Sequence, residues 1–121
     1  MIQHWKEVVP YARQLDLYPV EYVKKFAERI GFAHLKDMEI LEKEDEGNER
    51  MRDGRATKCV ANGSGIIDIE GVIHALLETG YTGGMTVEYG KDPEEAHLES
   101  LAAAREYVAD CIKEWKQESL K

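Results

Sequence analysis

The sequence predicts an α/β fold built from parallel βα units. Two observations carry this prediction. Helix-like apolar spacing alternates along the chain with short apolar runs, and proline, aspartate or glycine stands where most of these segments begin or end. The expected order is helix, strand, loop, strand, helix, strand, helix, which suits strands joined by crossover helices better than a sheet of hairpins. The 121 residues correspond to one domain or less, and a chain of this size can bury a usable core.

Four segments have apolar residues at the three- and four-residue spacing of a helix. They are residues 3–14, 19–29, 69–79 and the segment that begins at 92–95 and continues nearly to the end of the sequence. Pro10 weakens the first prediction, because proline removes a backbone donor inside a helix. Asp68 is the expected N-cap of the third helix and Gly80 its terminator. His74 and His97 lie in the last two helices and are expected at the surface.

Three shorter apolar runs predict strands, and a highly charged segment separates the first two. The strands are expected within 31–40, 57–61 and 83–90, and residues 39–58 are interpreted mainly as a loop. A loop that directly follows a strand is a common place for functional residues. "NGSG" at residues 62–65 predicts a turn whose backbone N–H groups lead into a helix start. This turn is therefore a candidate site for a sugar phosphate group.

Polar side chains stand at the ends of two of these strands. Side chains alternate along a strand, so His34 and Lys36 share one face of the first, and Glu88 lies on the same face as Thr86 in the last. In neighbouring parallel strands, His34 and Glu88 would project together at the carboxyl end. An imidazole and a carboxylate are ordinary ligands for Mn²⁺, Zn²⁺, Co²⁺ or Mg²⁺. The alternative is a structural histidine near the end of a strand.

The overall charge narrows the classes of partner. The formal net charge is −8, and no basic stripe offsets it, which argues against nucleic acid or an anionic membrane as the main partner. The sequence contains no run of about 18 apolar residues, so no transmembrane helix is expected. The first residues lack the pattern of a signal peptide. Two cysteines are too few for a disulfide scaffold. The expected location is the cytoplasm.

Two stretches of the sequence together resemble a known family. They are "RIGFAHLKD" and "NGSGIIDIEGVIHALLETGYTGGMTVEYGKDPEE". In this combination and order they resemble the end of the sugar phosphate isomerase/epimerase family. That family belongs to the xylose-isomerase-like TIM barrel superfamily, which also includes inosose dehydratases and endonuclease-IV-type proteins. The resemblance extends over about residues 19–115.

The resemblance implies a partial TIM barrel of parallel βα units, with two to three strands and three to four helices. A complete barrel takes about 250 residues and eight strands. Residues 1–121 are therefore interpreted as a single C-terminal fragment of such a barrel. Two further metal ligands of the family, a glutamate and an aspartate on earlier strands, have no counterpart here, and neither does its second catalytic glutamate.

The resemblance also implies roles for individual residues. His34 and Glu88 match the family's metal ligands on the first and last of these strands, and Glu88 matches its acid/base. Lys36 matches a lysine that faces the substrate. A substrate-facing arginine is expected from the loop that follows, with Arg55 as the assigned residue. Arg50 and Arg52 remain alternatives, since none of the three aligns securely.

The resulting hypothesis is a divalent-metal-dependent isomerase or epimerase of a sugar or sugar phosphate. It would be competent only with the missing part of the barrel, and this chain alone would hold the metal weakly. One alternative is a catalytically inactive barrel fragment that serves as an assembly or interaction module. Another is a lyase like the inosose dehydratases. Because a partial barrel exposes strand edges, self-association or a complementary barrel chain is expected.

Overall fold

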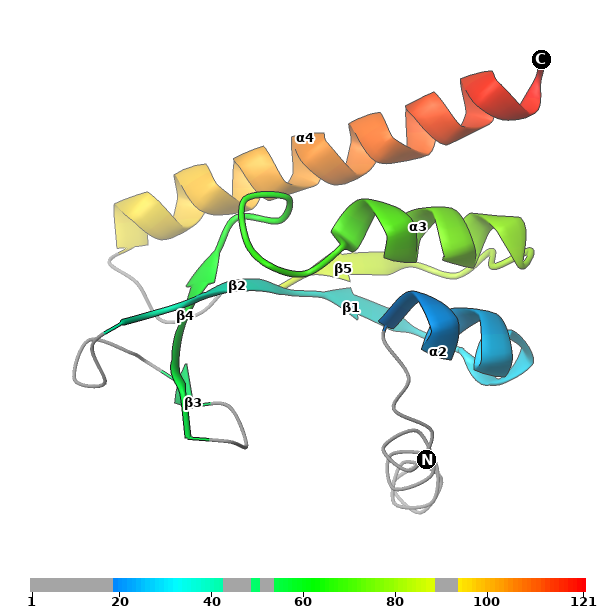
Figure 1. The fold of residues 1–121 in the computed structure, drawn as a ribbon. Helices are drawn as coiled ribbons and strands as arrows, with labels where there is room; N and C mark the ends of the chain where they lie inside the picture. The colour runs from blue at the N-terminus through cyan, green and yellow to red at the C-terminus, as the bar shows by residue number, and fades with distance from the viewer. Residues whose placement is uncertain (1–18, 43–48, 51–53, 89–93) are drawn as a thin grey trace.

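The computed structural model describes residues 19–42, 49–50, 54–88 and 94–121 (Figure 1). In chain order, these residues form α2 (Pro19–Phe26), the short 3₁₀ helix η1 (Ala27–Arg29), β1 (Ala33–Leu35), β2 (Asp37–Ile40), β3 (Glu49–Arg50), β4 (Ala56–Val60), α3 (Ile69–Glu78), β5 (Met85–Val87) and α4 (Glu94–Ser119). The expected helix at 3–14 lies outside the described residues, as do Arg52 and the start of the last helix at 92–93.

The strands β1 and β5 are parallel neighbours, as the sequence predicted. Ala33 pairs with Met85, His34 with Thr86, and Leu35 with Val87. The helix α3 lies between them in the chain and packs against α2 on one side and α4 on the other. This arrangement confirms the predicted parallel pair, although only two strands take part in it among the described residues.

The remaining strands form a separate antiparallel sheet, and here the predicted topology is wrong. The expected strand at 31–40 divides at Lys36 into β1 and β2, and β4 returns alongside β2 with Val60 opposite Asp37 and Thr57 opposite Ile40. The two-residue β3 adds to the other edge of β4. Within 39–58, the described residues of β2, β3 and β4 are therefore strands, and the loop interpretation is wrong for them. Their high charge indicates exposure, but ladder hydrogen bonds come from the backbone and form regardless of side-chain charge.

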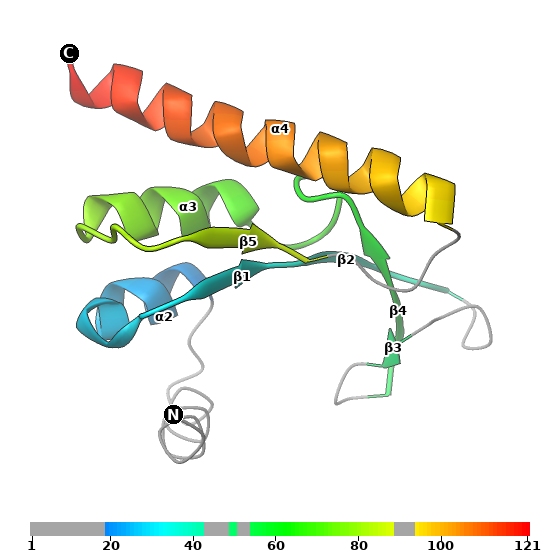
Figure 2. The ribbon, with the colours of Figure 1, turned by 180° about the vertical axis from the view of Figure 1, so that it is seen from behind.

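The hydrophobic core lies between the helices and one face of the parallel pair. Leu35 of β1 packs with Ile69 and Ile73 of α3 and with Val108 and Cys111 of α4. A second buried group, which joins α2 to α3, consists of Val23, Ala75 and Leu76. Each fully buried leucine or isoleucine contributes on the order of 2 kcal/mol. Seen from behind in Figure 2, β5 runs in front of α3 and β1 runs in front of α2, and no described helix covers this outer face of the parallel pair.

Both ends of α3 follow the predicted capping chemistry. The Asp68 carboxylate accepts the backbone N–H of Gly71 at 2.9 Å, which satisfies one of the free donors of the first turn. Gly80 has a φ of 81° directly after the helix, a conformation that glycine adopts at little cost. Among the described helices, none combines the length and apolar character needed to cross a membrane.

Candidate functional site at the carboxyl ends of β1 and β5

The structure brings His34 and Glu88 together on the uncovered face of the parallel pair. His34 Nδ1 lies 3.3 Å from Glu88 Oε2, and the two side chains are 53% and 47% exposed. The position of Glu88 follows from the strand register, because its backbone N–H donates to the carbonyl of Leu35 at 2.9 Å. An ion pair this exposed contributes at most about 1 kcal/mol. The contact therefore adds little to the stability of the fold. Its relevance lies in the imidazole and carboxylate groups that it brings together.

The other predicted substrate residues lie at different distances from this pair along the hairpin. Lys36 is half-buried and joins β1 to β2, two residues beyond His34. Arg55 precedes β4, and the register that sets Thr57 opposite Ile40 places it at the end of the hairpin farthest from β1. Arg50 of β3 donates from Nη1 to the carbonyl of Gly54 at 3.2 Å. Two of the predicted residues, His34 and Glu88, are in direct contact.

The turn at 62–65 does not offer its N–H groups to a phosphate, contrary to the candidate role that the sequence suggested. The carboxylate of Asp37 is fully buried and accepts the N–H groups of Gly63 at 3.0 Å and Gly65 at 2.9 Å. It also accepts those of Met38 at 2.8 Å and Ile67 at 3.1 Å. The anion that this turn binds is therefore part of the protein.

The same turn contains Asn62, which sequence reasoning did not single out. Asn62 is 4% exposed, and its Nδ2 donates to the carbonyl of Leu35 at 3.3 Å. That carbonyl is also the acceptor for Glu88. An asparagine before a Gly-Ser-Gly sequence is typical of a turn residue, so no local signal indicated this contact.

His74 is less exposed than predicted. Its side chain is 24% exposed, and its Nε2 lies 3.9 Å from Glu70 Oε1 one helical turn earlier. This nitrogen is buried and has no hydrogen-bond partner among the described residues. The prediction of a surface histidine is therefore wrong for the ring nitrogen, because α3 is packed on both sides. The side chain of His97 lies outside the described residues.

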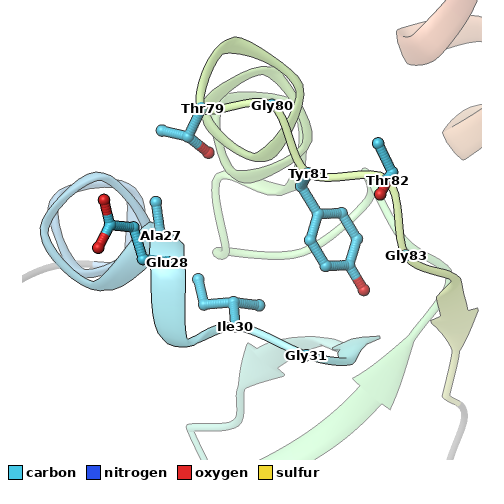
Figure 3. Close-up of a pocket in the computed structure, with 9 residues that line it drawn as sticks. All are labelled: Ala27, Glu28, Ile30, Gly31, Thr79, Gly80, Tyr81, Thr82 and Gly83. Carbon is cyan, nitrogen blue, oxygen red and sulfur yellow. The ribbon is translucent and has the colours of Figure 1, made fainter.

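A pocket of about 390 Å³ lies at the opposite, amino end of β1 and β5 (Figure 3). Its walls come from the ends of η1 and α3 and from the segment before β5. The hydroxyl of Tyr81 donates to the carbonyl of Gly84 at 2.7 Å, and that of Thr79 donates to Ala75 at 2.8 Å. The hydroxyl donors of Tyr81 and Thr79 are thus already used within the chain, and Glu28 and Thr82 are further polar residues of the lining.

The donor atoms of His34 and Glu88 fit two positions of a divalent metal site. A neutral imidazole nitrogen and a carboxylate oxygen are the ligand types that Mn²⁺, Zn²⁺ and Co²⁺ accept. Among the described residues, no group of three or more histidine, cysteine, aspartate or glutamate side chains is placed to hold a metal ion. The described part of the chain therefore has two donor atoms of these types in contact, without a third beside them.

Comparison with known proteins finds a set of curated relatives of this chain. No protein-family model matches the chain. A protein of Clostridium botulinum is 35% identical over 96 residues, which are 76% of this chain and 32% of that relative. A protein of Bacillus licheniformis is 36% identical over 90 residues, and one of Geobacillus kaustophilus is 35% identical over 95. All three are named inosose dehydratase. The chain is similar to part of an inosose dehydratase.

The similarity covers only part of each relative. The chain spans about a third of the length of the curated relatives that it matches, since the aligned regions are 30–32% of each. An α/β structure with one parallel strand pair is consistent with part of a larger fold. Two thirds of each relative therefore has no counterpart in this chain.

Proposed function

We propose that this chain is the C-terminal part of a xylose-isomerase-like barrel and contributes to a lyase reaction of the inosose dehydratase type. The observation that carries the proposal is the 3.3 Å contact of His34 and Glu88 at the carboxyl ends of two adjacent parallel strands. Barrel enzymes place their reacting groups at this end of the strands. The names of the relatives favour the lyase, an alternative in the sequence analysis, over the sugar isomerase that was its main hypothesis.

The proposed substrate class is a polyhydroxylated ketone. Glu88 is the proposed base: its carboxylate removes a proton from the carbon next to the carbonyl, and the C–H electron pair becomes the C=C bond of an enolate. As the carbonyl re-forms, the enolate electron pair becomes a C=C bond to the following carbon and the C–O bond of its hydroxyl group breaks. That hydroxyl group takes the proton held by Glu88 and leaves as water. An isomerase would begin with the same proton transfer but return the proton to a different carbon. The first step is therefore shared by both hypotheses.

His34 has two proposed roles at this site. Its Nδ1 faces Glu88 Oε2, so it holds the carboxylate in one orientation and leaves Oε1 to accept the proton. With a divalent metal bound, His34 Nδ1 and Glu88 Oε2 would be its ligands in place of this direct contact, and the metal would polarise a substrate carbonyl. Of the candidate substrate residues, Lys36 would act beside this pair, whereas Arg55 lies at the end of the hairpin farthest from β1.

The proposal includes a partner, because the parallel pair is incomplete in the described chain. Parallel strands are found in sheets with both faces covered and their edges paired. Here the outer face carries His34 and Glu88 and has no described helix over it. We therefore expect a complementary chain with the remaining strands, or a second copy of this chain, to complete the site.

A second candidate function is an assembly or interaction module without catalytic activity. It is favoured by one observation: the described residues contain no third metal ligand beside His34 and Glu88. The two candidates differ in what a complementary chain would add. A lyase gains turnover when the missing strands are supplied, whereas an assembly module gains only stability.

Calorimetric titration with Mn²⁺ tests the site in the chain itself. The wild type should bind weakly, and His34→Ala and Glu88→Gln should each remove most of the binding heat. Glu78→Gln is the matched control, because Glu78 makes an equally exposed ion pair with Lys24, at 3.8 Å, on the helices. Equal binding by all four proteins would remove His34 and Glu88 from the site. Strong dehydratase turnover by this chain alone would show that no complementary part is needed.

A further inference from the structure

Asn62 connects three segments that are distant in sequence. It lies in the turn after β4, and its Nδ2 donates to the carbonyl of Leu35, the last residue of β1. The same carbonyl accepts the backbone N–H of Glu88, the residue that follows β5. One acceptor at the end of β1 thus ties the turn to the two strands whose ends carry His34 and Glu88.

The turn that holds Asn62 is fixed on its other side. The next residue, Gly63, and also Gly65 donate their N–H groups to the buried carboxylate of Asp37. Gly65 has no room for a side chain, because an added Cβ would meet Asp37 Oδ1 and the carbonyl of Met38. The donor of Asn62 therefore comes from a segment whose own position is set by the protein interior.

The orientation of the Asn62 amide follows from its acceptor. Rotating the amide by half a turn would set Oδ1 against the carbonyl of Leu35 and place two acceptors in contact. In the orientation observed, Oδ1 is buried without a hydrogen-bond partner among the described residues. A buried acceptor without a partner is unfavourable. The donor Nδ2 is therefore the atom through which the amide contacts the rest of the described chain.

We propose that Asn62 is a positioning residue for the His34–Glu88 pair. Its Nδ2–H group holds the end of β1 against the turn. The same Leu35 carbonyl accepts the backbone N–H of Glu88, so Asn62 also fixes the backbone position from which the Glu88 side chain extends. The inference rests on the proposed function, in which this pair is the reacting site. Reacting groups must be held within about 0.5 Å of their productive placement, and supporting hydrogen bonds supply that precision.

The distance between the two side chains can be measured without any metal or substrate. With Nδ1 and Oε2 3.3 Å apart, the His34 ring protons lie near the Glu88 side chain, and the folded chain should show a nuclear Overhauser cross-peak between the ring and the Glu88 γ-methylene. Asn62→Ala should weaken this cross-peak at least about twofold, since small displacements exceed the tolerance of such a site. Asn62→Ser is a second variant, because its hydroxyl is too short to reach Leu35 and serine is well tolerated in turns.

Ser64→Ala is the matched control for this measurement. Its hydroxyl donates to the carbonyl of Ala61 at 2.6 Å within the same turn and is exposed. Removing it perturbs the turn without touching the Leu35 carbonyl, so the cross-peak should keep its wild-type intensity. Backbone amide spectra of each variant show whether the chain is folded and separate a lost contact from a lost fold.

Each outcome of this experiment bears on a different proposal. A wild-type cross-peak that keeps its intensity in whichever Asn62 variants are folded would overturn the positioning role and leave the His34–Glu88 pair intact. The same role would be overturned if Ser64→Ala weakened the cross-peak as much as Asn62→Ala does. Absence of the cross-peak from the wild type would instead remove the support for the proposed reacting site, and with it this inference. Weakening in the Asn62 variants alone is the expected result.

Discussion

Asp37 Oδ2 lies 2.9 Å from the backbone nitrogen of Gly65, inside the turn that precedes α3. The same carboxylate accepts three further backbone N–H groups, and the side chain is 0% exposed. Hydrogen bonds to a charged group contribute more than those between neutral groups. The contact therefore joins β2, the turn and the start of α3 into one unit. The exposed His34–Glu88 pair, by contrast, contributes little to folding.

Asp37→Asn should strongly destabilise the chain. Asparagine keeps the shape but replaces one accepting oxygen with an N–H₂ group, which then faces backbone donors in a buried site. We expect the free energy of unfolding to fall by about 3 kcal/mol, measured by urea denaturation. Asp68→Asn is the control, because asparagine is about as good an N-cap as aspartate. Equal, small losses in both variants would contradict the structural role of Asp37.

Gly65→Ala tests the space beside the same carboxylate. An added Cβ would meet both Asp37 Oδ1 and the backbone carbonyl of Met38, which cannot move without breaking the turn. The expected loss is at least about 2 kcal/mol, within the range for overpacked sites. Gly31→Ala is the matched control: nothing lies within 4 Å of its Cβ position, so a change below about 0.5 kcal/mol is expected. A Gly65→Ala variant as stable as Gly31→Ala would show that the turn adapts.

The sequence predicted the parts of this fold that local chemistry determines. The helices were found because apolar spacing and caps such as Asp68 act within a few residues. The approach of His34 and Glu88 was predicted because alternation along two parallel strands leaves few other arrangements. In both cases the signal lies within the element that it describes.

Contacts between distant segments were not predictable in the same way. Asp37 and Gly63 are 26 residues apart, and no local pattern shows that the N–H groups of the turn would bind a carboxylate of the chain itself. The antiparallel hairpin was missed because its charged residues resemble a solvated loop, whereas the backbone ladder that forms it leaves no periodic signal in so short a strand as β3. Asn62 was interpreted only as a turn residue, because its contact with Leu35 joins positions 27 residues apart and leaves no local pattern.

Tyr107→Phe should change how stability depends on pH. Burial, aided mainly by the neighbouring Cys111 thiol, raises the pKa of Tyr107 from 10.0 to about 12. Because the folded pKa is the higher one, the unfolded chain releases this proton first as pH rises. The contribution is thus complete below pH 10 and is lost between pH 10 and about 12. The urea midpoint of the wild type should fall more steeply over this window than that of Tyr107→Phe, and parallel curves would contradict the assignment.

Phe32→Asp should reduce association through the uncovered face of the parallel pair. Phe32 precedes β1, is 59% exposed, and its ring lies 5.0 Å from that of His34. Exposed apolar groups beside open strand edges favour contact with another chain. Sedimentation of the wild type should show self-association that Phe32→Asp weakens. Leu120→Asp is a matched change just after α4, at a residue that is 88% exposed, and should leave self-association unaltered. A wild type that stays monomeric at high micromolar concentration would remove self-association and leave a complementary chain as the expected partner.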